Sequence, residues 1–272
     1  MAYIYQLEQF ETNPKLYSHL YYCYRKVFDE QTKQKLMLFE NVHFQMIKTA
    51  WFYQDQDVAR QKLIWWHEEL KNTFNGSPQH PISKQLNQID LTNNQQQLII
   101  EMSEYALAFV IYDSQVDSYE VLVSHLINYF YAFEKLKASC FVSNDLETNI
   151  RPIAEIIALV HYIYFLPELM KRDLLLPTDS YLNHYNVTLA QLKQYKLSEG
   201  ITYWLNSLNK QVQKIHKTLK SQLNLKSKKQ LKPLMINLNL WLKLLKETKK
   251  NNYDLFNTQI QLSPVQMLLQ SV

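Results

Sequence analysis

Apolar residues recur every three or four positions along almost the whole chain, the spacing that places side chains on one face of an α-helix. In KLMLFENVHFQMIKTAW, residues 35–51, they form one continuous stripe. The 272 residues include only two glycines, Gly76 and Gly200. Sheet-rich folds and phosphate-binding loops need glycine for tight turns and close backbone approach. We therefore expect an all-α protein without a Gly-rich nucleotide site.

The same periodicity predicts helices at about 95–112, 118–140, 151–171, 188–222 and 231–250. Another helix is expected to begin at Asp57, a good N-cap residue, and to end at Gly76-Ser77-Pro78. Pro81 suits the first turn of the helix after it. Because no internal repeat or long linker divides the chain, we predict a single domain spanning 1–272, with its core at about 15–250.

Three features bear on the compartment. Cys23 and Cys140 are far apart and neither belongs to a CxxC pair, which favours reduced core cysteines. The opening MAYIYQLEQFE has no pattern of a signal or transit peptide. The longest apolar run, IIALVHYIYFL, is shorter than the roughly 20 residues of a membrane span. We expect a cytoplasmic protein that is at most peripheral on the inner membrane.

Charge is unevenly distributed. Residues 1–209 hold 17 Lys and Arg against 23 Asp and Glu, whereas residues 210–250 hold 12 lysines against a single acid, Glu247. The favoured interpretation is a terminal helix with a solvated lysine face. The alternative is peripheral contact with an anionic membrane or an acidic partner. No nucleic-acid-binding motif accompanies the lysines, so nucleic acid is not an expected partner.

Common catalytic motifs do not match. HEEL at 67–70 is followed by Lys71, where a zinc protease needs a second histidine. The GxSxG turn of a serine hydrolase is absent, because Gly76 and Gly200 are far apart in the sequence. His43 lies on the apolar stripe, so we expect a hydrogen-bonded core residue rather than a metal ligand.

Two segments resemble the squalene/phytoene synthase superfamily. VARQKLIWWHEELKNTFNGSPQHPISKQL, residues 58–86, carries a Trp-Trp helix followed by a Gly-x-Pro-x-His-Pro turn. FLPELMKRDLLLPTDSYLNHYNVTLAQL, residues 165–192, is similar to the stretch after the family's second aspartate-rich motif. The resemblance covers most of residues 15–250. It implies a prenyl-synthase-like helical bundle around a central cavity, in an enzyme class that joins two allylic diphosphates head to head.

That chemistry uses Mg²⁺ held by an Asp-x-x-x-Asp motif on each of two facing helices. Aspartates four residues apart share one helix face, and Mg²⁺ binds carboxylate and phosphate oxygens. The first motif falls on residues 47–51, IKTAW, with no acid, and Lys48 would repel the ion. The second falls on residues 164–168, where Tyr164 and Glu168 occupy the aspartate positions. We therefore expect both motifs to be lost and no metal cofactor to be bound.

Three functions follow from the resemblance. The favoured one is a non-catalytic family member, similar to a mitochondrial complex I assembly factor and its bacterial relatives, that binds a membrane-associated protein complex or an isoprenoid lipid. The first alternative is a divergent isoprenoid diphosphate transferase, which would need Mg²⁺. The second alternative is a carrier of isoprenoid or quinone tails.

The altered motif positions also predict contacts. We expect Lys48 to lie near Glu168 or a tyrosine hydroxyl, because a buried unpaired lysine is unfavourable. Trp51 and Tyr164 are expected to fill the former active site, because large aromatic side chains close space.

Three basic residues are weaker substrate-binding candidates. Arg60 could bind substrate, although pairing with Asp57 or Glu68 is the favoured role. Lys171 and Arg172 could hold an anion at the mouth of a pocket, or they could complement the dipole of a helix C-terminus.

Overall fold

Helices make up nearly all of the regular structure. The computed structural model describes residues 19–25, 27, 29–111, 116–141, 147–258 and 260–271, with backbone only at 147 and 148. Within these ranges there are no strands, and the one isolated bridge joins Val116 to Pro177. The predicted all-α, single-domain fold is confirmed. The opening MAYIYQLEQFE and residues 15–18 of the predicted core lie outside the described residues.

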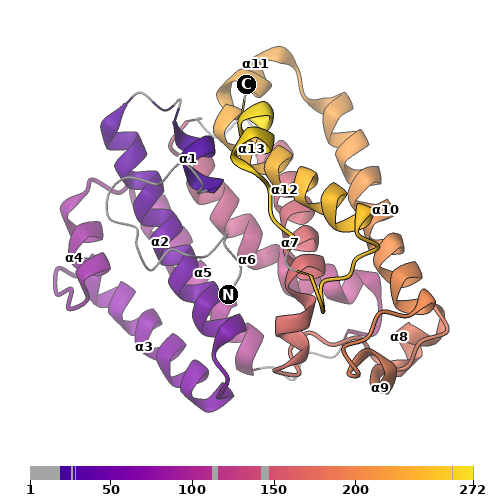
Figure 1. Ribbon diagram of the computed structural model, residues 1–272. Coiled ribbons are helices and arrows are strands. Elements are labelled where there is room, and N and C mark those ends of the chain that lie inside the picture. The colour runs from indigo at the N-terminus through magenta and orange to yellow at the C-terminus, as the bar shows by residue number, and fades with distance from the viewer. Residues whose placement is uncertain are drawn as a thin grey trace.

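The first half of the chain forms the helices on the left of Figure 1. Their bounds are α1 His19–Tyr24, α2 Glu30–Phe52, α3 Gln56–Phe74, α4 Pro81–Gln88, α5 Asn93–Ile111 and α6 Tyr119–Ala138. Short polar side chains cap the N-termini of several of these helices. Asp29 accepts a hydrogen bond from the Thr32 amide at the start of α2, and Ser118 accepts one from the Val121 amide at the start of α6. Such caps satisfy amides that have no partner inside the helix.

The second half begins with the longest apolar helix and ends beside α1. Its bounds are α7 Glu147–Met170, α8 Asp179–Asn183, α9 Leu189–Leu192, α10 Glu199–Gln222, α11 Leu225–Gln230, α12 Lys232–Lys250 and α13 Pro264–Gln270.

Helix α7 is the centre of the bundle. It packs against α6 and α2 on one side and against α10 and α12 on the other (Figure 1). Its segment Asn149–Met170 is long and apolar enough to cross a membrane, but 83% of that window is buried by neighbouring helices. The segment is therefore accounted for as the core helix of the bundle.

Local details differ from the sequence-based expectations in two places. Asp55, not Asp57, caps α3, because its carboxylate accepts from the amides of Asp57 and Val58. The helix predicted at 188–222 is two helices, separated by a turn in which Tyr195 has φ 55°. Pro167 lies in the last turn of α7, and the helix continues through it to Met170.

Both glycines occupy positions that require them. Gly76 ends α3 with φ 82°, a conformation that other residues rarely adopt. Gly200, in the first turn of α10, lies so close to the preceding loop that an added Cβ would be 2.4 Å from Val187 Cγ2 and 2.5 Å from the Tyr185 carbonyl oxygen. The few glycines are thus used only where a turn or a close contact excludes a side chain.

Candidate functional site

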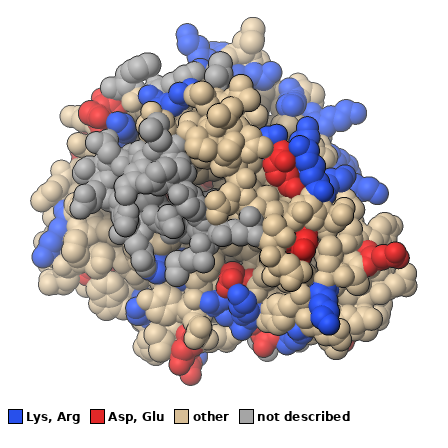
Figure 2. Space-filling view, in the orientation of Figure 1, with Lys and Arg blue, Asp and Glu red and all other residues tan. Residues whose placement is uncertain are grey.

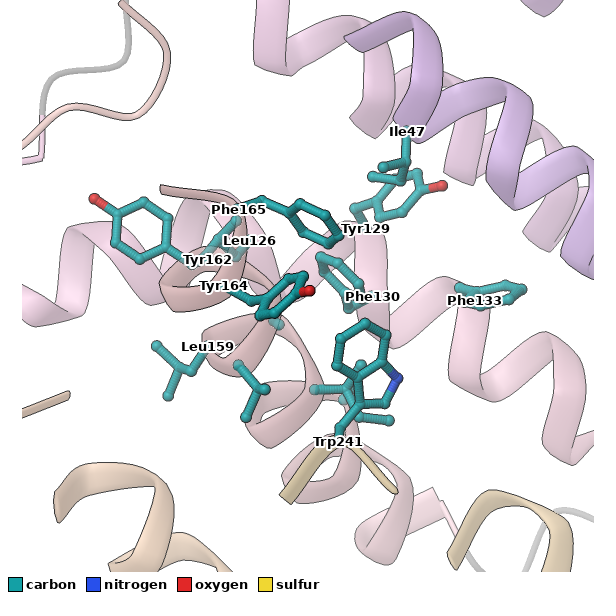
Figure 3. Close-up of a cluster of buried hydrophobic side chains, with 14 of the residues drawn as sticks. Ile47, Leu126, Tyr129, Phe130, Phe133, Leu159, Tyr162, Tyr164, Phe165 and Trp241 are labelled. Carbon is teal, nitrogen blue, oxygen red and sulfur yellow. The ribbon is translucent and has the colours of Figure 1, made fainter. Parts of the chain in front are cut away.

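The position of the first metal motif is packed with apolar side chains. Ile47 and Trp51 on α2 are fully buried. The Trp51 ring lies 5.8 Å from Phe109, 6.1 Å from Phe130 and 6.3 Å from Phe165, measured between ring centroids. Figure 3 shows Ile47 and Phe165 in the same aromatic cluster as Phe130. Hydrated Mg²⁺ would have to displace this cluster to bind here.

Lys48 does not form the expected contact with Glu168. Lys48 is half-buried, with Nζ 5.6 Å from the centre of the Phe44 ring. Glu168 instead pairs with its own helix end, placing Oε1 2.8 Å from Lys171 Nζ and Oε2 3.4 Å from an Arg172 nitrogen. Burial alone would raise the pKa of Glu168, but the hydrogen bonds and charges of these two cations outweigh it and lower the pKa.

Tyr164, at the other position of the second motif, contributes a phenol in place of a carboxylate. Its hydroxyl donates to the Ile260 carbonyl at 2.6 Å, which ties α7 to the segment before α13. Burial raises the Tyr164 pKa to about 12, so the hydroxyl stays neutral. A neutral phenol already used as a donor is a poor Mg²⁺ ligand.

The residues at the two motif positions therefore do not fit a Mg²⁺-diphosphate cluster. Together they contribute one carboxylate, that of Glu168, and two cations already engage it. Elsewhere in the described ranges, no group of three His, Cys, Asp or Glu side chains is arranged to hold a metal ion.

Arg172 is a structural link between helices. Its Nε donates to the Tyr53 carbonyl at 2.6 Å, and its two terminal nitrogens donate to the carbonyls of Phe52 and Glu168. The Gln56 side chain donates back to the Arg172 carbonyl at 2.5 Å. The side chain is only 7% exposed, so the guanidinium fastens the α2–α3 turn to the end of α7.

The other two substrate-binding candidates lie on the surface. Lys171 is 53% exposed and pairs with Glu168. Arg60 is exposed on α3 and places a guanidinium nitrogen 2.6 Å from Asp57, the pairing favoured from the sequence. Lys171 and Arg172 both engage the carboxylate of Glu168, whereas Arg60 pairs with Asp57 on α3.

Loss of the Arg172 guanidinium should destabilise the protein. We expect Arg172→Met to lower the free energy of unfolding by roughly 2–4 kcal/mol, because buried carbonyls lose charged donors. Lys171→Met, at the neighbouring exposed position, should change it by less than about 0.5 kcal/mol. Denaturant unfolding measures both, and equal stability of the two variants would contradict the structural role.

A groove of about 490 Å³ opens beside the second motif. It lies between the ends of α2 and α7 and residues 255–258 and 260, and its lining includes Tyr164, Phe165 and Phe256. Glu168 and Arg172 also line it, but their charges are already paired.

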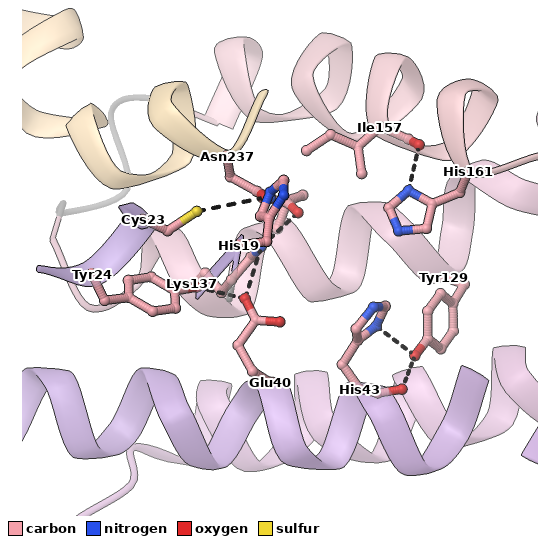
Figure 4. Close-up of polar contacts among 11 residues, drawn as sticks. His19, Cys23, Tyr24, Glu40, His43, Tyr129, Lys137, Ile157, His161 and Asn237 are labelled. Carbon is pink, nitrogen blue, oxygen red and sulfur yellow. Dashed lines mark hydrogen bonds and ion pairs between the residues drawn. The ribbon is translucent and has the colours of Figure 1, made fainter. Parts of the chain in front are cut away.

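The centre of the bundle contains a buried polar cluster that the sequence did not predict. We define this central polar cluster as His19, Glu40, His43, Glu134, Lys137, His161 and Asn237, which line a cavity of about 30 Å³ (Figure 4). That is room for about one water molecule, far below the roughly 300–1,000 Å³ of ligand pockets. The cavity at this cluster is therefore too small for an organic ligand.

Lys137 carries the positive charge of the cluster. Its Nζ lies 2.7 Å from Glu134 Oε1 and 3.5 Å from Glu40 Oε1, and its side chain is 2% exposed. The Tyr24 hydroxyl donates to the same Glu40 oxygen at 2.5 Å. Burial would lower the pKa of Lys137, but the two carboxylates outweigh it and raise the pKa, so the amine stays protonated. For Glu134, burial dominates and raises the pKa.

Three histidines also line this cavity. His19 Nε2 is 2.8 Å from Asn237 Oδ1, and His161 Nδ1 donates to the Ile157 carbonyl at 2.8 Å. His43 Nδ1 is 2.9 Å from the Tyr129 hydroxyl, which confirms the predicted hydrogen-bonded core role.

Burial keeps these imidazoles neutral. It lowers the pKa of His19 to about 4 and that of His161 to about 3, and it lowers the pKa of His43 well below its usual value. The charge of Lys137 acts in the same direction on all three.

The spacing of charged residues on α6 indicates part of this cluster from the sequence alone. Glu134 and Lys137 lie in phase with Leu126, Phe130 and Phe133 on an amphipathic helix, so a buried ion pair could have been inferred from their spacing.

Comparison with known proteins shows the fold. No protein-family profile and no curated protein sequence matches the chain. Among solved structures, a dehydrosqualene synthase in complex with ligand has a TM-score of 0.68 at 14% identity, covering 93% of this chain and 95% of that one. The squalene synthase HpnC from Alicyclobacillus acidocaldarius has a TM-score of 0.57 at 12% identity, covering 86% and 94%.

YisP from Bacillus subtilis subsp. subtilis strain 168 is also similar, with a TM-score of 0.54 at 12% identity and coverage of 89% and 98%. The chain thus has the all-α fold of the squalene and dehydrosqualene synthases over nearly its full length. Identities this low establish the fold alone, so the function has to be argued from the residues.

Proposed function

We propose that this protein is a non-catalytic member of the squalene/phytoene synthase superfamily, which keeps the helical bundle as a binding scaffold. The observation that carries the proposal is that packed side chains occupy the positions where the sequence resemblance places the two metal motifs. Trp51 is fully buried on α2, and Tyr164 on α7 is hydrogen-bonded to the Ile260 carbonyl. Ionisation of an allylic diphosphate needs a cation cluster to take up the leaving charge, and these residues do not supply its ligands.

The expected role is that of an assembly-factor-like protein, whose partner is a membrane-associated protein complex or an isoprenoid lipid. This is the favoured sequence-based hypothesis, and the small volume of the cavity at the central polar cluster supports binding at the surface rather than in that cavity. The transferase alternative would need paired carboxylates at positions 47–51 and 164–168. The tail-carrier alternative would need an apolar chamber; its best location is the groove beside Tyr164 and Phe256.

The proposal predicts no turnover of farnesyl or geranylgeranyl diphosphate. Purified protein with Mg²⁺ or Mn²⁺ should release no pyrophosphate above a buffer control, while a dehydrosqualene synthase assayed in parallel should release it. Circular dichroism checks that the protein in the assay is folded. Release that is abolished by Glu168→Ala would show that the remaining carboxylate still serves catalysis, and it would overturn the proposal.

A further inference from the structure

Helix α13 exposes an apolar stripe. Val265, Leu268 and Leu269 are 65%, 40% and 68% exposed, and their spacing places them on one face of the helix. Met267 points the other way and is buried against the bundle. Figure 2 shows an area without charge where Figure 1 places α13, with lysines beside it. An apolar stripe left in water next to charged groups is typical of a binding surface.

A lysine-lined groove adjoins this stripe. The groove runs between α10 and α12, has a volume of about 570 Å³, and is lined by Lys220, Lys243, Lys246 and Lys249. Gln270, the last residue of α13, also lines it, so the apolar stripe and the groove belong to one surface.

Most lysines that line the groove are not neutralised by an acidic side chain in the described ranges. Lys243 pairs with Glu247 at 2.7 Å, and Glu247 is the only acid among residues 210–250. Lys220, Lys246 and Lys249 are exposed and form no ion pair with any described residue. Several unneutralised lysines in one concave surface attract an anion strongly.

His216 adds a polar group to the same groove. Its Nε2 is buried and has no hydrogen-bond partner among the described residues. Burial, and secondarily the charge of Lys220, lowers the His216 pKa, so the ring is neutral at neutral pH. A neutral imidazole can donate one hydrogen bond to a phosphate oxygen.

Exposed apolar residues on α3 lack this excess of positive charge. Val58, Ile64 and Trp65 are also exposed, but Asp57 and Glu68 pair with Arg60 and Lys71 on the same helix. An excess of cations next to an apolar stripe therefore distinguishes α13 from α3.

We propose that α10, α12 and α13 form a surface that binds anionic phospholipid bilayers: the stripe of α13 enters the headgroup–acyl boundary, and the lysine groove holds lipid phosphates. Amphipathic surfaces with lysines beside leucines bind membranes in this way. The inference deepens the lipid-binding arm of the proposed function by naming the surface and the lipid class. A lysine close to an anionic bilayer strengthens partitioning by about fivefold.

Vesicle sedimentation with the full chain tests the inference. The protein should sediment with vesicles of phosphatidylcholine mixed with phosphatidylglycerol, should bind pure phosphatidylcholine much more weakly, and should be released by added salt. Lys246→Glu/Lys249→Glu should lower the partition coefficient at least about 25-fold, the effect of two lysines. Leu268→Ser/Leu269→Ser should lower it roughly tenfold or more.

Matched variants on distant surfaces serve as controls. Lys84→Glu/Lys196→Glu makes the same charge change, and Val58→Ser/Ile64→Ser removes the same kind of apolar group. Both should bind like the wild type. The inference is overturned if anionic vesicles are not bound, if the Lys246→Glu/Lys249→Glu and Leu268→Ser/Leu269→Ser variants both bind normally, or if the controls lose as much binding.

A competing occupant gives a different result. If the stripe of α13 joins two copies of this chain, light scattering will show a dimer that Leu268→Ser/Leu269→Ser converts to a monomer, and the membrane assignment fails. Vesicle binding and pyrophosphate release are independent readouts. Failure of the vesicle assay leaves the non-catalytic proposal standing, and pyrophosphate release leaves the membrane surface standing.

Discussion

Lys137→Met should lower the free energy of unfolding by about 3–5 kcal/mol, one of the two largest effects that the structure predicts. The substitution keeps the apolar stem but leaves the carboxylates of Glu134 and Glu40 buried without a cation, and breaking a buried pair from one side has this cost. At roughly 2–4 °C for each kcal/mol, the melting temperature should fall by about 10 °C. Denaturant and thermal unfolding of the purified variant measure the change.

A compensated variant separates charge from packing. Lys137→Met/Glu134→Gln/Glu40→Gln removes all three charges and should recover much of the lost stability, because a neutral core no longer contains an unpaired carboxylate. Lys84→Met, which removes an exposed lysine on α4, should unfold within about 0.5 kcal/mol of the wild type. If the triple variant is as unstable as Lys137→Met alone, the charge explanation is wrong.

The protein should also lose stability steeply between about pH 6.5 and pH 4. His19, His43 and His161 have depressed folded-state pKa values, about 4 for His19 and about 3 for His161. Below pH 6.5 the unfolded chain binds protons that the folded chain does not, so the stability present above pH 6.5 is lost as the pH falls. Each histidine contributes at most about 1.4 kcal/mol per pH unit, and the three together roughly 4 kcal/mol per pH unit.

One carboxyl group opposes this trend. Burial raises the pKa of Glu134 in the folded state, so protonation of Glu134 in acid favours the folded state and offsets part of the loss. His161→Asn, which retains a donor for the Ile157 carbonyl, should reduce the pH slope by about a third. His184→Asn, at an exposed position, should leave the slope unchanged. Equal unfolding free energies at pH 7 and pH 5 would contradict the conclusion that the three buried histidines are neutral in the folded protein.

Much of the fold follows from local sequence patterns. The apolar stripe around His43 predicts a buried face of α2, and the Gly76-Ser77-Pro78 end of α3 is where the sequence places it. These features depend on side-chain spacing and on one backbone conformation, both of which a single sequence displays. The burial of Trp51 belongs to the same class, because that residue continues the stripe.

The polar contacts could not be predicted in the same way. Lys48 was expected to lie near Glu168 or a tyrosine hydroxyl, whereas Glu168 pairs with Lys171 and Arg172 and the buried ion pair is formed by Lys137 with Glu134 and Glu40. The spacing of Glu134 and Lys137 on the apolar face of α6 is visible in the sequence, but the relative rotation of packed helices decides that Glu40 of α2 meets them. That rotation depends on contacts far apart in sequence. The hydrogen bonds of Arg172 could not be predicted for the same reason, because the carbonyls of Phe52 and Tyr53 lie about 120 residues away in the sequence.

The most direct test of the central claim is a crystal of the protein soaked with Mn²⁺ and a non-hydrolysable farnesyl diphosphate analogue. Mn²⁺ prefers the same oxygen ligands as Mg²⁺ and is located by its anomalous scattering. We predict no manganese peak between α2 and α7, with Trp51 still packed against Phe165 and Glu168 still paired with Lys171. A manganese ion bridging Glu168 and the diphosphate would contradict the account.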